Sequence, residues 1–265
     1  MDQELCGKIA LVTGASRGVG AETARQLARG GATVILAARS REQGETVAQL
    51  ICADGGNAEF IQLDVTSRDS WCALVAHVME RHGALHILIN NAGVHIARAL
   101  ENCSEMDFYK QVETNLKGVF LGCQTTLPLL RESAAHCGDA AIVNVSSIAG
   151  LVGVANQTLY NMTKGGLQLF SKSLALELAP QGVRVNCVNP GMIENDMGDA
   201  LVEQLVNEQM FADTESASRY LHRQIPLRRF ARSGEVAKAI THLANPSSSY
   251  MTGTEMVLDG GLTAG

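Results

Sequence analysis

The chain has few of the features that mark several large classes of protein. Only 4% of its 265 residues are aromatic and five are proline, and no apolar run approaches the roughly 18 residues that cross a membrane. The formal net charge is −6, so the chain lacks the basic face with which proteins bind nucleic-acid phosphates. We therefore expect neither a nucleic-acid partner nor a membrane-spanning protein.

The cysteines and histidines do not have the sequence spacing that is typical of redox pairs or metal sites. The seven cysteines are scattered and form no C-x-x-C pair, which favours reduced apolar side chains over disulfides. The seven histidines show no H-E-x-x-H or other ligand spacing, so no catalytic metal is predicted. The first four residues include two acids, Asp2 and Glu4, and no base. A secretory signal opens with basic and then apolar residues, so we expect a cytoplasmic protein.

Short apolar runs alternate with helical segments along the whole chain. The runs lie at 8–13, 33–38, 59–63, 85–89, 140–145, 183–188 and 255–258, and helical spacing covers 19–29, 41–54, 67–82, 105–130, 157–179 and 233–244. Because the runs are continuously apolar, they predict strands buried on both faces, as in a parallel sheet with helices on each side. Residues 1–265 are predicted to form one α/β domain.

The segment 192–225 is too long to be a simple connection. Long insertions in compact domains are often lids or binding loops. Gly191 and Gly198 can absorb the backbone rotation of closing, so we expect the segment to close over a bound ligand. The alternative is a helix pair packed permanently on the sheet.

A glycine-rich loop at 13–20 joins the first predicted strand to the first helix. Glycines at such a junction allow a tight turn and a close approach to a pyrophosphate, which the helix N-terminus binds through its N–H groups and dipole. The spacing G-x-x-x-G-x-G differs from the usual G-x-G-x-x-G, but its position predicts a dinucleotide site. The expected contacts are Gly14, Ser16, Arg17, Gly18, Val19 and Gly20.

The end of the second strand selects between the two nicotinamide dinucleotides. An acid at this position binds the ribose 2′-hydroxyl of NAD, but here Ala38 is followed by Arg39. Arg39 and Arg17 can both pair with a 2′-phosphate through charge-assisted hydrogen bonds. We therefore predict NADP(H) rather than NAD(H) as the cofactor.

Further polar residues lie where predicted strands end. Asn90-Asn91-Ala92-Gly93 ends the fourth strand and Ser146-Ser147 ends the fifth, at the edge where open α/β sheets bind ligands. Tyr160 and Lys164 are four residues apart on a predicted helix and share a face. Over residues 8–261 the chain resembles the single-domain type of the short-chain dehydrogenase/reductase family. The matching motifs are T-G-x-x-x-G-x-G at 13–20, Asp64-Val65, N-N-A-G at 90–93, Asn115, Ser147, Tyr160, Lys164 and Asn189-Pro190-Gly191.

The resemblance implies a doubly wound Rossmann-like fold with a seven-stranded sheet of order 3-2-1-4-5-6-7. It also implies that Tyr160 is the general acid/base and that Lys164 lowers its pKa and holds the nicotinamide ribose. Ser147 would bind the substrate oxygen, and Asn115 would hold a water for proton relay. The further cofactor contacts that it implies are Asp64, Val65, Asn91, Ala92, Gly93, Pro190, Gly191, Ile193 and Asn195, the last in place of a threonine common among relatives.

Apart from the catalytic Ser147, the expected substrate pocket is mostly apolar, with His95 as the one polar group placed to touch the substrate. The residues expected to line it are His95, Ser147, Val152, Met192 and Met197. Such a lining favours interconversion of a hydrophobic ketone and a secondary alcohol, by an NADP(H)-dependent oxidoreductase acting on CH–OH groups. The main alternative is a 3-oxoacyl-acyl-carrier-protein reductase, although the predicted entrance lacks the basic patch that would dock an acidic carrier. A non-catalytic dinucleotide-binding regulator is a more distant alternative, because such proteins usually lose part of the Asn–Ser–Tyr–Lys set.

Two predicted helices, 105–130 and 157–179, carry apolar residues that we expect on outward faces. These residues are Val119, Cys123 and Leu127 in the first helix and Leu167, Phe170 and Leu174 in the second. In the resembling family, two such helices from each subunit form a four-helix interface. The C-terminal strand and the helix before it form a second interface. We therefore expect a homotetramer, with a homodimer as the alternative.

Overall fold

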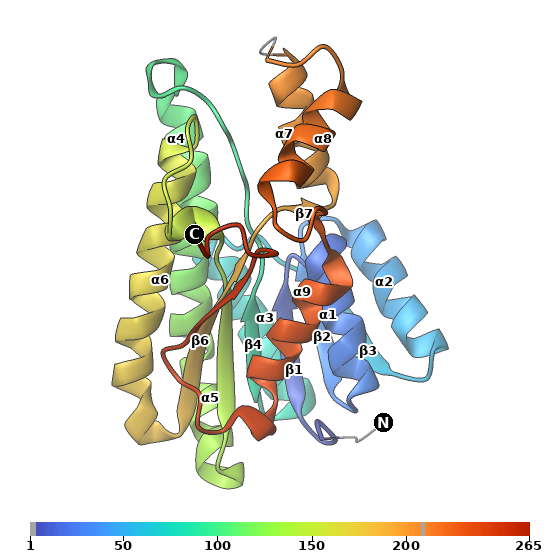
Figure 1. Ribbon diagram of the computed structural model, residues 1–265. Coiled ribbons are helices and arrows are strands. Elements are labelled where there is room, and N and C mark those ends of the chain that lie inside the picture. Colours follow the sequence, from blue (N-terminus) through green and yellow to red (C-terminus); the bar gives the residue numbers. More distant parts are fainter. Residues whose placement is uncertain (1–3, 208–209) are drawn as a thin grey trace.

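Seven parallel strands form the central sheet of the computed structural model (Figure 1), which describes residues 4–207 and 210–265 apart from the side chains at 196, 197, 204, 205 and 207. The strands are β1 (Ile9–Thr13), β2 (Thr33–Ala38), β3 (Asn57–Gln62), β4 (Ile87–Asn90), β5 (Ala140–Val145), β6 (Val183–Pro190) and β9 (Glu255–Leu258). Their order is β3-β2-β1-β4-β5-β6-β9, and every pair is parallel. The predicted order is confirmed, with β9 as the seventh strand.

Helices cover both faces of the sheet. On one face lie α1 (Gly18–Arg29), α2 (Arg41–Ala53) and α9 (Ser233–Ala244), and on the other lie α3 (Arg68–His82), α5 (Gly118–Cys137) and α6 (Thr158–Leu178). Ala10 and Val12 of β1 pack into the first layer, whereas Leu11 packs into the second. Because successive strand residues point to opposite faces, continuously apolar strands supply two cores at once.

The predicted helix 105–130 is in fact three segments. α4 (Glu105–Val112) starts at a capping box formed by Ser104 and Asp107, and a π-helical turn at Glu113–Lys117 separates it from α5. The π turn inserts an extra residue into the helical repeat and so shifts which side chains point inward. Asn115 lies in this turn, with only 1% of its surface exposed.

Six apolar residues of the predicted helices 105–130 and 157–179 were expected to face outward, and this prediction is wrong for three of them. Val119, Cys123 and Leu167 are buried in the core against the sheet. Leu127, Phe170 and Leu174 are partly buried against the same core. The exposed large apolar residues on these helices and on α4 are Met106, Phe108, Tyr109, Phe120, Met162, Leu169 and Leu176.

The long segment after β6 forms a helical pair at one end of the molecule (Figure 1). It contains β7 (Ile193–Glu194), α7 (Asp196–Asn207) and α8 (Thr214–Gln224), and β7 pairs with β8 (Ala231–Arg232) in a small second sheet. The two helices share a separate core built from Val202, Ala217, Leu221, Ile225 and Phe230. No helix among the described residues is long and apolar enough to span a membrane.

Candidate active site

A cavity of about 970 Å³ lies at the carboxyl edge of the sheet. All the predicted cofactor contacts line it: Gly14, Ser16, Arg17, Gly18, Val19, Gly20, Arg39, Asp64, Val65, Asn91, Ala92, Gly93, Tyr160, Lys164, Pro190, Gly191, Ile193 and Asn195. Four of the five predicted substrate contacts line it as well, namely His95, Ser147, Val152 and Met192. The fifth, Met197, has a side chain outside the described part of the structure.

The glycine loop is held tightly against the end of β4. The Thr13 hydroxyl accepts hydrogen bonds from the N–H groups of Asn91 (3.0 Å) and Ala92 (3.1 Å). A Cβ atom on Gly20 would lie 2.3 Å from the Gly14 carbonyl oxygen, so only glycine fits there. On Gly18, by contrast, a Cβ would meet nothing within 4 Å, because this glycine borders the cavity.

The start of α1 fits an anionic group such as a pyrophosphate. Within the described part of the chain, the N-cap residue Arg17 makes no side-chain cap and the first turn holds no acidic residue, so neither of these features opposes an anion at the first N–H groups. Together with the space beside Gly18, this leaves a cradle into which a dinucleotide phosphate fits. The loop residues are therefore suited to the cofactor that the sequence predicts.

The end of β2 carries positive charge next to the cavity. Arg17 and Arg39 are both exposed and line it, and Ala38 supplies no acid. Asp64 lies nearby, and its carboxylate accepts hydrogen bonds from the Thr66 N–H (2.9 Å) and hydroxyl (2.8 Å). These bonds, with a smaller contribution from Arg39, lower the pKa of Asp64.

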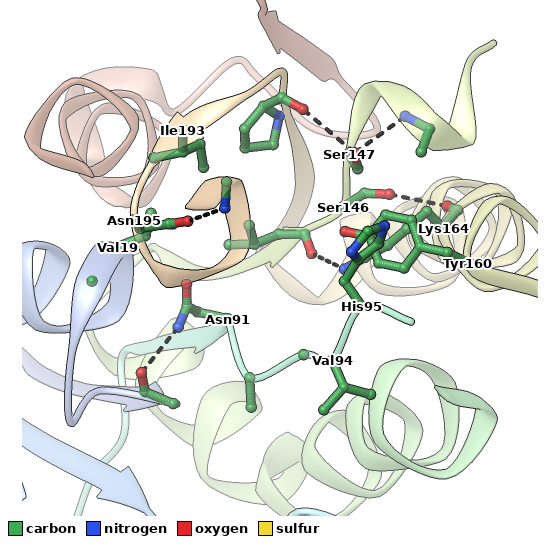
Figure 2. A pocket seen from close by; sticks show the side chains of 18 of the residues that line it. Val19, Asn91, Val94, His95, Ser146, Ser147, Tyr160, Lys164, Ile193 and Asn195 are labelled. Atoms are coloured by element: carbon green, nitrogen blue, oxygen red, sulfur yellow. Dashed lines mark hydrogen bonds between the residues drawn. The ribbon is translucent and has the colours of Figure 1, made fainter. Parts of the chain in front are cut away.

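Ser147, Tyr160 and Lys164 come together where β5 meets α6 (Figure 2). The Ser147 hydroxyl accepts a hydrogen bond from the Ala149 N–H (3.1 Å), and Ser146 Oγ donates to the Lys164 carbonyl (3.0 Å). Lys164 Nζ lies 5.6 Å from the centre of the Tyr160 ring. The bond from Ser146 ties the first turns of α6 to the end of β5 and so fixes this group.

Burial shifts the pKa of both central side chains. It raises the pKa of Tyr160 to about 12, although interaction with the Ser147 hydroxyl works in the opposite direction. It lowers the pKa of Lys164 to about 8. Among protein groups alone, the pKa of Tyr160 is therefore raised by burial rather than lowered, and the opposing contribution comes from Ser147 and not from Lys164.

Asn115 acts as a clamp behind the cavity wall. Its Oδ1 accepts a hydrogen bond from the Val94 N–H (2.8 Å), and its Nδ2 donates to the Val94 carbonyl (2.9 Å) and to Thr163 Oγ1 (3.2 Å). Both ends of the amide are thus engaged by the protein. The structure gives this side chain a positioning role, and the relay water that the resemblance assigns to it stays a prediction.

Several lining residues were not anticipated from the sequence. They are Ser40, Gln43, Gln157, Gln224, Phe230, Leu262 and Thr263, among others. Gln157 precedes Tyr160 by three residues at the start of α6, so helical spacing provided a signal for it. Leu262 and Thr263 gave no such signal, because a turn with positive φ angles at Gly260 (65°) and Gly261 (90°) brings them to the cavity.

A doubly wound sheet with a glycine loop and a buried Tyr–Lys pair at its carboxyl edge defines the class of dinucleotide-dependent oxidoreductases. A family model described as enoyl-(acyl carrier protein) reductase matches residues 14–263. The chain belongs to the short-chain dehydrogenase/reductase family.

Relatives of the chain include enzymes that act on alcohols and on oxoacyl groups. Trans-4-hydroxycyclohexanecarboxylate dehydrogenase from Sinomonas cyclohexanicum is 36% identical over 97% of this chain and 93% of its own. The 3-oxoacyl-[acyl-carrier-protein] reductase of Staphylococcus aureus is 39% identical over 96% of this chain and 98% of its own. The crystal structure of a variant of actinorhodin polyketide ketoreductase with NADPH superposes with a TM-score of 0.91, at 34% identity and 99% coverage of both chains.

Proposed function

We propose that the protein interconverts a hydrophobic ketone and a secondary alcohol with NADP(H). The observation that carries the proposal is the buried phenol of Tyr160 at the cavity wall, with Ser147 and Lys164 around it. When bound, the dinucleotide donates or accepts the hydride. The residues of the chain then have to bind the carbonyl oxygen, move one proton to it and exclude water.

Tyr160 is suited to donate that proton during reduction. Because burial raises its pKa to about 12, the phenol keeps its proton at neutral pH until negative charge develops on the substrate oxygen. The Ser147 hydroxyl provides a second hydrogen bond to the same oxygen. In the reverse direction the phenolate would accept the proton, and the nearby Lys164 ammonium would stabilise it.

The proposed preference for NADP(H) rests on the charge at the end of β2. Arg17 and Arg39 line the cavity where an acid that selects NAD is missing, and the similar ketoreductase structure contains NADPH. We also propose a reducing, cytoplasmic location, which fits the scattered spacing of the seven cysteines.

The direct test is oxidation of NADPH and NADH with a panel of ketones. We expect kcat/KM to be higher with NADPH than with NADH, and higher for ketones on an apolar skeleton than for charged ketones. Acyl thioesters belong in the same panel, because the similarity to the Staphylococcus aureus reductase makes an oxoacyl substrate the second candidate. Faster reduction of a carrier-bound 3-oxoacyl thioester than of any free ketone would favour that candidate, and cofactor binding without any turnover would favour a regulator.

We further propose that the enzyme assembles through the exposed apolar side chains of α5 and α6. Phe120, Leu169 and Leu176 remain 43–81% exposed, and Tyr250 and Val257 are exposed near and on the edge strand β9. Two such surfaces on one subunit fit two isologous contacts and hence a homotetramer, whereas α5 and α6 alone fit a homodimer. Light scattering at micromolar concentration tests this, and a mass of 28.2 kDa would exclude both assemblies.

A further inference from the structure

The imidazole of His95 packs against the proposed general acid. Its ring centre lies 4.6 Å from that of Tyr160, with the two planes at 85°, in an edge-to-face contact (Figure 2). His95 also lines the cavity, as does Gln157, the polar neighbour of its ring. A polar side chain thus lies against the ring of the proposed general acid and borders the same cavity.

The loop that carries His95 has no regular secondary structure, yet buried side chains hold it on both sides. Val94 is clamped by Asn115, and the Ile96 N–H donates to Gln111 Oε1 (3.2 Å). Asn115 and Gln111 are each at most 1% exposed. Val94 and Ile96, the residues on either side of His95, are thus both hydrogen-bonded to buried side chains. These bonds fix the backbone of His95 although it lies in a loop.

The loop is also joined to the segment that precedes α6. The Arg98 N–H donates to the Asn156 carbonyl (2.6 Å), and Asn156 adopts the left-handed conformation at φ 61°. The next residue, Gln157, is the helix N-cap and is 9% exposed. The loop after β4, which carries His95, and the start of α6, which carries Gln157, are therefore held next to each other at the cavity.

The ring offers the hydrogen bonds of a neutral imidazole. Burial lowers the pKa of His95, with interaction with Gln157 opposing the shift and Lys164 adding to it, so the ring is uncharged at neutral pH. A neutral imidazole has one donor and one acceptor nitrogen. Apolar side chains also line the cavity, among them Val152, Val154 and Ile148.

We propose that His95 and Gln157 form a second recognition point, which binds a neutral hydroxyl on the carbon next to the reacting carbon. A hydroxyl fits best because it both donates and accepts, and so it satisfies the pair in either tautomer. The inference rests on the proposed function and narrows it to hydroxy ketones and the corresponding diols. His95 and Gln157 interact with each other, but an unsubstituted ketone gives the remaining donor and acceptor sites of the pair no partner. A site built to hydrogen-bond a hydroxyl discriminates strongly against a substrate that lacks it.

Matched substrate pairs test the inference. Each pair is a plain ketone and its 2-hydroxy derivative, for example cyclohexanone with 2-hydroxycyclohexanone and 1-indanone with 2-hydroxy-1-indanone, both reduced with NADPH. The readout is the ratio of kcat/KM for the hydroxy ketone to that for the plain ketone. We expect the wild-type ratio to be about ten or more, the effect of one or two uncharged hydrogen bonds.

Two substitutions at the same position separate hydrogen bonding from packing. His95→Phe keeps the edge-to-face ring contact with Tyr160 and removes both nitrogens, so the ratio should fall to about one. His95→Asn loses the ring but keeps a donor and an acceptor, so it should retain most of the ratio even if both rates fall. Gln157→Leu removes the amide that interacts with the His95 ring and should lower the ratio in the same direction as His95→Phe.

The outcomes distinguish this inference from the proposed function. If wild type reduces neither member of any pair, the proposed function fails and the inference falls with it. If wild type reduces plain ketones equally well or better, only the inference is overturned. The inference is also overturned if His95→Phe lowers both rates by the same factor, because His95 then only supports the Tyr160 ring.

Discussion

Lys164 Nζ lies 5.6 Å from the centre of the Tyr160 ring and donates its hydrogen bond to the Val145 carbonyl, at 3.0 Å. The ammonium is thus buried beside a phenol and a carbonyl, with no carboxylate among its described contacts. An ammonium without a carboxylate partner is costly to bury, and the lowered pKa of about 8 expresses that cost. The position of Lys164 is therefore explained by its proposed role rather than by stability.

Lys164→Met should abolish activity and stabilise the fold at pH 7. The folded pKa of about 8 lies below the usual 10.5, so the charged lysine destabilises the fold below pH 8, and this penalty disappears as the pH rises toward 10.5. The full shift corresponds to ~3 kcal/mol, of which about 1 kcal/mol is offset by loss of the bond to Val145. We expect Tm to rise by roughly 2–6 °C at pH 7 and less at pH 9.5.

Lys172→Met is the matched control for this experiment. Lys172 lies two turns further along α6, but it is half exposed and pairs with Glu255 at 2.6 Å. Its loss removes no buried charge, so Tm should stay level or fall slightly at both pH values. A Lys164→Met variant that is less stable than wild type at pH 7 would contradict the assignment of this lysine as a destabilising functional group.

Arg39→Ala should weaken the preference for NADPH. Loss of one charge-assisted contact to a 2′-phosphate should lower kcat/KM with NADPH about 10- to 100-fold and leave the value with NADH nearly unchanged. Arg41→Ala is the control, because Arg41 pairs with Glu45 at 3.1 Å and does not line the cavity. The argument fails if wild type prefers NADH or if the two variants lose NADPH activity equally.

Hydrogen exchange should show whether the segment 192–225 closes on binding. α7 and α8 pack on each other in their own small core, so they depend little on the main cores. We expect fast exchange over 194–215 in the free enzyme and slow exchange with NADPH and product bound. Equal, slow exchange in both states would identify a fixed wall, with Met192 as static lining.

The two glycines expected to act as hinges have another role in the structure. A Cβ atom on Gly198 would lie 2.2 Å from the Ile193 carbonyl oxygen, and one on Gly191 would lie 2.9 Å from Asp259 Cα. Both glycines therefore permit close backbone approach. Their presence is explained by packing and gives no evidence for a hinge, so the movement of the segment is tested by hydrogen exchange.

The sequence predicted the sheet and most of the cavity because both follow from local patterns. Continuously apolar runs mark buried strands, and ligand-binding residues cluster where parallel strands end. The inward direction of Val119 and Leu167 was missed because both helices carry apolar residues on more than one face. Periodicity alone does not say which face meets the sheet.

Other features depended on contacts that no local pattern encodes. The π turn at Asn115 arises inside a segment whose spacing is typical of one continuous helix. Phe230 and Leu262 reach the cavity from segments distant in sequence. The pKa of Tyr160 also depends on burial, which only the folded arrangement determines.

Tyr160→Phe tests the central claim most directly. The substitution keeps the ring against His95 and removes only the hydroxyl, so the NADPH dissociation constant should change less than about threefold while ketone turnover falls by about 10³-fold or more. Tyr109→Phe, at an exposed tyrosine on α4, should retain wild-type turnover. A Tyr160→Phe enzyme that binds NADPH and keeps a tenth of wild-type ketone turnover would contradict the assignment of Tyr160 as the general acid.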